Sequence, residues 1–155
     1  MLNIAPAESP RDIEDIRALF GEYAVLVAEA LCFQNFDQEL AALPGQYVPP
    51  DGALLIARDA GAAAGCVALR RCDPESGEMK RMFVRERYRG TGLGRRLAER
   101  AIDEARRRKY RRIVLDTLPK LKSAIALYRD LGFREIEPYL ASPTPGAVCF
   151  ELKFF

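Results

Sequence analysis

Residues 78–97 read EMKRMFVRERYRGTGLGRRL, and the rest of the chain is best understood from this stretch. An apolar strand leads into a basic loop with glycine at positions 90, 92 and 94, and an amphipathic helix begins directly after it. Amide groups at the start of a helix bind anions, because they are unpaired and lie at the positive end of the helix dipole. The stretch therefore predicts a binding site for a polyanion.

The glycine spacing separates this loop from the familiar nucleotide loops. A dinucleotide loop needs G-x-G-x-x-G, but Arg95 stands where the third glycine would be, and no G-x-x-x-x-G-K-[ST] run exists. The pattern present is R-x-x-G-x-G at Arg89–Gly94. A plain glycine-rich turn would explain the glycines, but it leaves the surrounding arginines to repel one another unless an anion is bound. These arginines are Arg85, Arg87, Arg89, Arg95 and Arg96.

Length and composition indicate a single domain, residues 1–155. No apolar run approaches the roughly 20 residues of a membrane-spanning helix. The N-terminal MLNIAPAESP lacks the basic-then-apolar pattern of a signal peptide. We expect a cytoplasmic protein without a membrane partner.

Histidine is absent from the chain. Its absence excludes histidine-based catalytic triads, histidine-ligated zinc and a neutral-pH imidazole base. The cysteines form no C-x-x-C pair, and we interpret them as reduced thiols. They are Cys32, Cys66, Cys72 and Cys149. Proton transfer therefore falls to carboxylate, tyrosine, lysine, cysteine or water, and no metal is expected.

The net charge of +2 conceals an uneven distribution. Residues 80–112 contain fourteen Lys or Arg and four Asp or Glu, whereas residues 1–59 contain ten acids and three bases. One side of the protein is thus suited to an anion and the other, more weakly, to a cation. The basic run at residues 106–112 is what a helix C-terminus favours. Contact of that run with a distant phosphate or an acidic partner is the alternative.

Hydrophobic periodicity and turn signals predict the order β-α-α-β-β-β-α-β-α-β. This order indicates an α+β fold (α/β in looser schemes), with a mixed, largely antiparallel sheet and helices on both faces. The expected strands are residues 2–5, 53–57, 65–71, 78–84, 113–116 and 148–154. The expected helices are residues 11–31, 36–43, 93–109 and 123–131. Residues 135–146, with three prolines, are expected to be mostly loop.

Two motifs resemble one known family. The strand, loop and helix around Arg89–Gly94 are followed by a further strand and a helix that ends in YRDLGF, residues 128–133. At this separation, the two motifs resemble the GCN5-related N-acetyltransferases (GNAT), in particular bacterial members of unassigned substrate. The resemblance implies a GNAT-like sheet and a single acetyltransferase domain. It also implies acetyl transfer from acetyl-CoA to a primary amine, by direct attack in a ternary complex.

The resemblance further implies where acetyl-CoA lies. Its pyrophosphate would rest on the backbone amides of Arg89–Arg95, where glycine lets the chain approach closely. Its pantetheine arm would pair with the backbone of Met82–Val84 where the sheet splays open, and an amide there would polarise the thioester carbonyl. Many relatives carry an asparagine near the start of the last helix, and here Ser123 or Lys120 would replace it. The expected donor-binding residues are Met82, Phe83, Val84, Arg89, Gly90, Thr91, Gly92, Leu93, Gly94, Arg95 and Ser123.

Tyr128 is the expected proton donor. It occupies the family's Y-x-x-x-G-F position, where a phenol with a pKa near 10 can protonate a leaving thiolate. From the residues alone, Tyr128 would equally be a packing residue on an apolar helix face with Leu127 and Leu131.

Glu78 is the expected general base. It stands six residues before Val84, the spacing of the catalytic glutamate in the histone-acetylating members of the family. Strand alternation places it on one face with Lys80, Met82 and Val84. Asp116 or water is the alternative base, and a solvated carboxylate paired to an arginine is the alternative role for Glu78.

Two other classes of function compete with the enzyme. One is a catalytically idle acyl-CoA-binding or regulatory domain, and the other is a nucleic-acid-binding module suggested by the basic segment. The second lacks paired aromatic residues and a recognised motif, so no nucleic-acid partner is expected. We expect a small-molecule amine or a peptide amine as acceptor, with a homodimer as one possible assembly.

Overall fold

The structure is a computed structural model and describes residues 1–27 and 35–155. Within these ranges the strands are β1 (Leu2–Pro6), β2 (Ala53–Asp59), β3 (Ala62–Asp73), β4 (Ser76–Val84), β5 (Arg112–Thr117), β6 (Arg134–Ile136) and β7 (Val148–Lys153). The helices are α1 (Pro10–Val27), α2 (Phe36–Ala42), α3 (Leu93–Arg107) and α4 (Lys122–Asp130), with a short 3-10 helix η2 (Glu86–Tyr88). Residues 28–31 of the predicted first helix lie outside the described residues, and so does Cys32.

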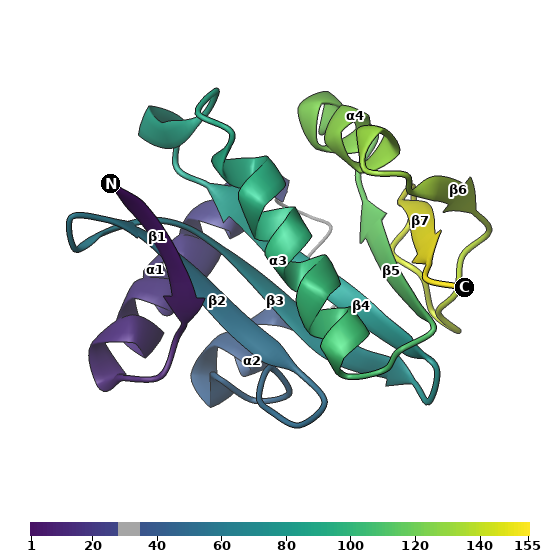
Figure 1. The fold of residues 1–155 in the computed structure, drawn as a ribbon, viewed down its shortest axis with the longest axis horizontal. Helices are drawn as coiled ribbons and strands as arrows, with labels where there is room; N and C mark the ends of the chain where they lie inside the picture. Colours follow the sequence, from purple (N-terminus) through teal and green to yellow (C-terminus); the bar gives the residue numbers. More distant parts are fainter. Residues whose placement is uncertain (28–34) are drawn as a thin grey trace.

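The strands form one sheet in the order β1-β2-β3-β4-β5-β7-β6. Neighbouring strands are antiparallel except β4 and β5, which are parallel. Helix α3 crosses one face of the sheet and α1 lies behind the opposite face (Figure 1). Each face is covered by its own apolar cluster, one with residues of α3 and α4 and one with residues of α1 and α2. The predicted α+β fold with helices on both faces is confirmed.

Local chemistry explains two of these elements. The hairpin between β2 and β3 turns through Ala60 and Gly61, whose φ angles of 50° and 91° are the two positive values of a type I′ turn. The predicted apolar face of α3 is buried as expected, since only small and branched side chains point at the sheet. Its buried aliphatic residues are Leu93, Leu97, Ala98, Ala101, Ile102 and Ala105.

One predicted loop contains a strand. Residues 134–136 form β6, which pairs antiparallel with β7 at the edge of the sheet. A three-residue edge strand is too short to show alternation, and the prolines that follow it indicate loop. Among the described residues, no helix is long and apolar enough to cross a membrane.

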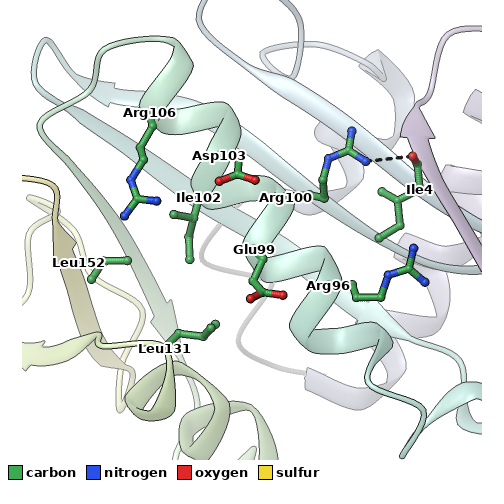
Figure 2. A pocket seen from close by; sticks show the side chains of 9 residues that line it. All are labelled: Ile4, Arg96, Glu99, Arg100, Ile102, Asp103, Arg106, Leu131 and Leu152. Atoms are coloured by element: carbon green, nitrogen blue, oxygen red, sulfur yellow. Dashed lines mark hydrogen bonds between the residues drawn. The ribbon is translucent and has the colours of Figure 1, made fainter.

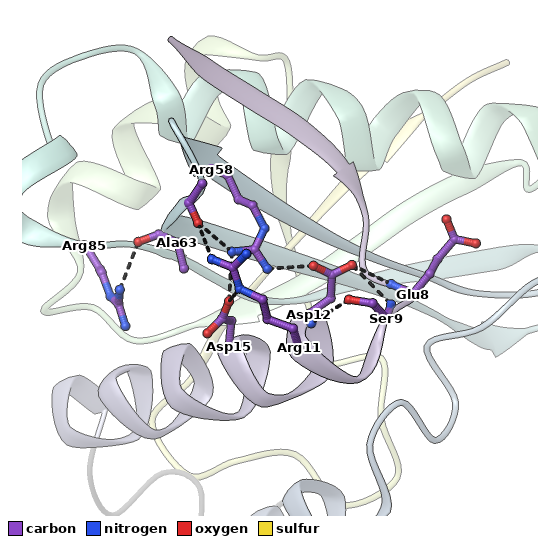
Figure 3. A network of polar contacts seen from close by, with 9 residues as sticks. Glu8, Ser9, Arg11, Asp12, Asp15, Arg58, Ala63 and Arg85 are labelled. Atoms are coloured by element: carbon purple, nitrogen blue, oxygen red, sulfur yellow. Dashed lines mark hydrogen bonds and ion pairs between the residues drawn. The ribbon is translucent and has the colours of Figure 1, made fainter.

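Acidic side chains of α1 are held by arginines of the protein itself (Figure 3). The Asp12 carboxylate accepts hydrogen bonds from the backbone N–H groups of Glu8 and Ser9 at 3.0 and 3.2 Å, and from Arg58 Nη2 at 2.6 Å. Arg58 also reaches Asp15 at 2.8 Å. Much of the acidity at this end of the sequence is therefore neutralised internally and is not presented to a ligand.

Replacing Asp12 with asparagine tests this pairing. The backbone N–H of Glu8 and then Arg58 lower the pKa of Asp12 to about 2, so its charge stabilises the fold above pH ~4 and the contribution is lost as the pH falls through about 2. Because the pair is partly screened by solvent, we expect Asp12→Asn to lower the free energy of unfolding by about 1 kcal/mol at pH 7. Urea unfolding between pH 7 and 2.5 should show the difference from wild type shrinking at the acid end. A difference that stays constant with pH would mean that the Asp12 charge contributes nothing.

Candidate active site

A split in the sheet separates β4 from β5. Their parallel pairing joins Ser76–Glu78 to Arg112–Val114. Beyond these residues β4 continues to Val84 and β5 to Thr117, but no further pairing between them occurs in the described part of the chain. The edge of β4 that faces β5 thus has no strand partner in the described residues around Met82–Val84, where the Val84 carbonyl accepts a hydrogen bond from Arg89 Nε at 3.1 Å.

A β-bulge in β4 lies beside the split. Cys66 of β3 is opposite Phe83 and Ala68 is opposite Lys80, so β4 carries one extra residue in this interval. The φ angle of Arg81 is 57°, in the left-handed region that non-glycine residues rarely adopt. The bulge locally interrupts β4 and is well suited to end the pairing of β4 with β5.

The bulge also changes which side chains share a face of the sheet. Met79, Met82 and Val84 pack with the α3 cluster, whereas Phe83 packs with the α1 cluster. Strand alternation from Met79 then places Lys80 on the α1 side. The prediction that Met82 and Val84 share a face with Glu78 and Lys80 is therefore wrong, because the extra residue shifts the alternation by one.

A small cavity of about 40 Å³ occupies the split. Both faces of the sheet contribute to its wall: Tyr23 comes from α1 on one face, and Tyr128 comes from α4 on the other. The lining residues are Tyr23, Met79, Lys80, Arg81, Met82, Leu115, Asp116, Thr117, Leu121, Ala124 and Tyr128. The cavity therefore connects the two sides of the sheet at one point.

Tyr128 is one of the residues that line this cavity. The side chain is only 6% exposed, and its ring packs against Phe133 and Phe150 with centroid distances of 5.7 and 6.3 Å. Burial raises the pKa of Tyr128 well above its usual value, so the phenol stays protonated at neutral pH. No hydrogen bond found among residues 1–27 and 35–155 uses its hydroxyl. The buried proton is therefore available to a ligand.

Glu78 is fully buried, and both of its carboxylate oxygens are occupied. Arg70 Nε donates to Oε1 at 2.6 Å, and the hydroxyl of Tyr139 donates to Oε2 at 2.5 Å. Glu78 does not line the cavity in the split, whereas Asp116 does. Of the two predicted bases, Asp116 is thus the one that a ligand in the cavity reaches directly.

The glycine loop has the shape that a bound polyanion needs. Gly90 and Gly92 adopt φ angles of 79° and 86°, and no atom lies within 4 Å of a Cβ added at either position. Gly92 caps α3, whose first turn carries no acidic residue. The space beside Gly90 and Gly92 is therefore open at the positive end of the helix, which suits a pyrophosphate.

Most of the surrounding arginines are bound to the protein. Arg85 pairs with Glu22 at 2.7 Å, Arg95 pairs with Asp130, and Arg96 donates to the carbonyl of Leu2. Arg89 Nε donates to the carbonyl of Val84 at 3.1 Å. Four of the five predicted anion-binding arginines thus have hydrogen-bond or ion-pair partners within the protein, and their clustering is not by itself a sign of a bound anion. The fifth is Arg87, which is exposed at the loop.

Three other predicted donor-binding residues lie around this loop. The Thr91 hydroxyl donates to the carbonyl of Tyr88 at 2.5 Å, which ties down the loop. Leu93 is buried in the core, so that only its backbone faces the anion site. Ser123 is exposed in the first turn of α4.

A second cavity, of about 530 Å³, lies elsewhere. It runs along the outer side of α3 toward Leu131 and Leu152, and side chains of both charges line it (Figure 2). Arg100 donates to the carbonyl of Ile4 at 3.0 Å, which ties α3 to β1. This cavity along α3 shares no lining residue with the cavity in the split.

The basic run after α3 is also engaged internally. Arg107 and Arg108 pair with Glu104, and Arg112 pairs with Glu151 at 2.9 Å. These contacts favour the interpretation of the run as the cationic end of a helix.

An open glycine loop at a helix N-terminus and a split in the sheet beside it are the features of a transferase site that takes a donor with a polyanionic tail. The profile described as "Acetyltransferase (GNAT) family" matches residues 13–133. The chain belongs to this family of acetyltransferases, as the two sequence motifs predict. Among the described residues, no group of side chains is arranged to hold a metal ion.

Similar proteins agree with this assignment. An uncharacterised N-acetyltransferase of Schizosaccharomyces pombe is 40% identical over 98% of this chain and 94% of its own length. An IAA acetyltransferase of Azospirillum brasilense is 44% identical over 58% of this chain and 60% of its own. The crystal structure of an acetyltransferase from Streptococcus agalactiae has a TM-score of 0.83 at 25% identity, and covers 99% of this chain and 98% of that one.

The sequence analysis gave an arginine partner for Glu78 as an alternative, but it identified neither Arg70 nor Tyr139. Arg70 lies eight residues before Glu78 on β3, in register directly opposite, so a hairpin pairing would have found it. Tyr139 comes from the segment after β6, which shows no pattern that points to β4. Tyr23 of α1 also lines the cavity, and the sequence shows no motif that indicates this position.

Proposed function

We propose that this protein transfers the acetyl group of acetyl-CoA to a primary amine by direct attack within one ternary complex. The observation that carries the proposal is the cavity in the split, since it joins Tyr128 on the α4 side to Lys80 and Asp116 on the α1 side. The donor can then enter from one face of the sheet and the acceptor from the other.

Acetyl-CoA is the donor. Two solved acetyltransferases with this fold, from Salmonella typhimurium and Elizabethkingia anophelis, are described with acetyl-CoA, at TM-scores of 0.71 and 0.67 and 20% identity each. In this chain, the backbone amides of Arg89–Arg95 hold the pyrophosphate and the unpaired edge at Met82–Val84 holds the pantetheine arm. Ser123 lies at the other wall, on α4. When bound, acetyl-CoA supplies an activated acetyl group as a thioester.

The protein moves two protons. Asp116 accepts a proton from the incoming ammonium group, and the neutral amine then forms the new C–N bond as the C–S bond breaks. The Tyr128 hydroxyl holds the proton that the leaving sulfur takes up, and the second amine proton restores the phenol. A backbone N–H of Met82–Val84 donates to the carbonyl oxygen as negative charge develops on it.

Glu78 has a supporting role in this scheme. Its carboxylate holds Arg70 and Tyr139 in place, which fixes the wall behind the acceptor. The acceptor is a small-molecule or peptide amine. A cytoplasmic location is part of the proposal, and the free thiols of Cys66, Cys72 and Cys149 are typical of a reducing compartment.

The direct test is release of free thiol from acetyl-CoA in the presence of a panel of amines, amino acids and peptides. We expect release that depends on the acceptor and stays at background without one. A protein that binds acetyl-CoA but releases no thiol with any acceptor would be the idle binding domain instead.

Gly94→Ala tests the donor path separately from the chemistry. A Cβ at Gly94 points between β4 and α4, at 3.7 Å from Leu127 and 3.9 Å from Val84, which is ordinary contact. The fold should therefore gain about 0.5 kcal/mol of helix propensity. The affinity for acetyl-CoA should fall about tenfold, because the added methyl group narrows the gap that the donor fills.

Calorimetric titration with acetyl-CoA and thermal unfolding together make this measurement. Gly21→Ala on α1 is the matched control, since a Cβ there meets no atom within 4 Å. It should raise stability and leave acetyl-CoA affinity unchanged. If Gly94→Ala and wild type bind acetyl-CoA with equal affinity, acetyl-CoA does not occupy the gap beside Gly94.

A further inference from the structure

The bulge in β4 has an arginine where glycine is usual. Arg81 and Met82 together lie opposite one residue of β3, Val67, and Arg81 is the first of the two. When the first residue of a bulge is left-handed it is normally glycine, which takes this conformation without steric cost. Arg81 takes it with φ at 57°, although a Cβ disfavours the left-handed region by about tenfold in population. The backbone alone therefore does not explain an arginine at this position.

The side chain of Arg81 is anchored by two helices. Arg81 is 3% exposed, and its Nε and Nη2 atoms donate to the two carboxylate oxygens of Glu39 on α2, each at 2.8 Å. The guanidinium group also lies over the rings of Tyr23 on α1 and Phe36 on α2, at 5.9 and 5.3 Å from the ring centroids. Residues of α1 and α2 thus hold this one side chain of β4 in place.

The main chain of Arg81 is held from the neighbouring strand. The Sγ atom of Cys66 on β3 donates to the carbonyl of Arg81 at 3.4 Å. Burial raises the pKa of the Cys66 thiol, so the sulfur keeps the proton that it donates. A sparsely populated backbone conformation persists where the surrounding structure over-determines it. Glu39, the two rings and Cys66 provide that restraint at Arg81.

The bulge lies between the paired and the split parts of β4. Pairing with β5 ends at Glu78, and Met82–Val84 begins directly after Arg81. Successive backbone amide groups of a strand point alternately toward its two neighbouring strands. One extra residue therefore changes which amide groups of Met82–Val84 face β3 and which face the split.

Resting on the proposed function, we infer that Arg81 is a positioning residue for acetyl-CoA. Its side chain, held by Glu39, fixes the left-handed bulge, and the bulge aims the amide groups of Met82–Val84 at the donor. Arg81 acts through the main chain that follows it. The ion pair with Glu39 also makes the geometry of the donor edge depend on the position of α2.

Alanine and glycine at position 81 separate the backbone from the side chain. Arg81→Ala and Arg81→Gly are compared in a Glu39→Gln background, so that no unpaired carboxylate is left beside them. Both lose the same side-chain contacts and differ in how readily they become left-handed. We expect kcat/KM for acetyl-CoA, and the affinity for acetyl-CoA, to be about tenfold higher with glycine than with alanine. At an ordinary strand position glycine would be the less favourable residue.

Glu39→Gln alone tests the anchor, and it decides the question if the double variants do not fold. Glutamine keeps the shape of the side chain but removes the charge that holds Arg81, so kcat/KM for acetyl-CoA should fall about tenfold. The KM for the amine should not change. A loss confined to the KM for the amine would overturn the inference, because Glu39 would then act on the acceptor.

Glu104→Gln is the matched control for loss of a buried, paired carboxylate. Glu104 is 7% exposed on α3, pairs with Arg107 and Arg108, and does not line the cavity in the split. Glu39→Gln and Glu104→Gln should both lower the Tm, and only Glu39→Gln should change the kinetics. Equal kinetics in the two variants would mean that the pair of Glu39 with Arg81 serves stability alone.

Hydrogen exchange at residues 82–84 reports the bulge without turnover. We expect the exchange rates to differ from wild type by about tenfold in the alanine double variant and to stay near wild type in the glycine one. Equal exchange and equal rates in the two would overturn the inference and leave the acetyltransferase intact. A difference in exchange with no difference in rate or affinity would also overturn it, because the bulge would then not act on the donor.

Binding covers the case in which wild type releases no thiol with any acceptor. Higher acetyl-CoA affinity in the glycine double variant, with exchange like that of wild type, would support the positioning role while the proposed chemistry fails. Equal affinity and equal exchange in the two double variants would then overturn both.

Discussion

Replacing Tyr128 with phenylalanine should lower the rate of acetyl transfer by about 10²- to 10³-fold, the range in which a positioned general acid contributes. The substitution removes only a hydroxyl that no hydrogen bond among the described residues uses, and it keeps the ring packing with Phe133 and Phe150. Stability and acetyl-CoA affinity should therefore change little. Steady-state thiol release, calorimetric titration and thermal unfolding of the same preparation measure the three quantities.

Tyr110→Phe is the matched control for loss of a buried phenol. Its hydroxyl donates to the carbonyl of Asp51 at 2.7 Å, and Tyr110 does not line the cavity in the split. This variant should lose about 1 kcal/mol of stability and keep its turnover. An unchanged rate in Tyr128→Phe would mean that the ring only packs the helix face.

Asp116→Asn should lower kcat/KM at neutral pH by about 100-fold and should change the pH dependence. Burial raises the pKa of Asp116 above its usual value, so wild type loses its base form, and with it activity, as the pH falls through that raised pKa. The asparagine variant has no base at this position, so only the fraction of the amine that is already neutral can react. Its rate should therefore climb tenfold per pH unit up to the pKa of the amine, and the gap to wild type should narrow at alkaline pH.

Glu78→Gln separates the two predicted bases. Glutamine retains an acceptor for Tyr139 but loses the ion pair with Arg70, so we expect about 2 kcal/mol of lost stability and a smaller loss of rate. The pH profile should keep its wild-type shape. A profile that rises tenfold per pH unit in Glu78→Gln, and not in Asp116→Asn, would make Glu78 the base and contradict our assignment.

The sequence was most informative where structure follows from local pattern. The apolar stripe of α3, the turn at Ala60 and Gly61, and the glycine loop are all short-range features, and the structure has each where the pattern predicts it. The identity of the family also followed from two local motifs. Periodicity alone was enough for the order of the long elements.

The site depends on long-range contacts that local pattern does not encode. The bulge at Arg81 inserts a residue without any glycine or proline to indicate it, and so the alternation along β4 was assigned to the wrong face after Lys80. Tyr139 reaches Glu78 across 61 residues of sequence. The pairing of arginines with acids of α1 depends in the same way on which strands lie beside that helix.

The opening between β4 and β5 has a consequence for how substrate preference can change. In the proposed function, the donor is held at Met82–Val84 by main-chain groups, which every residue type supplies, whereas the acceptor meets side chains that line the cavity in the split, such as Asp116. Donor recognition is thus insensitive to which side chains stand there. A new acceptor can be accommodated by substitution beside the opening, while the grip on the donor stays as it was.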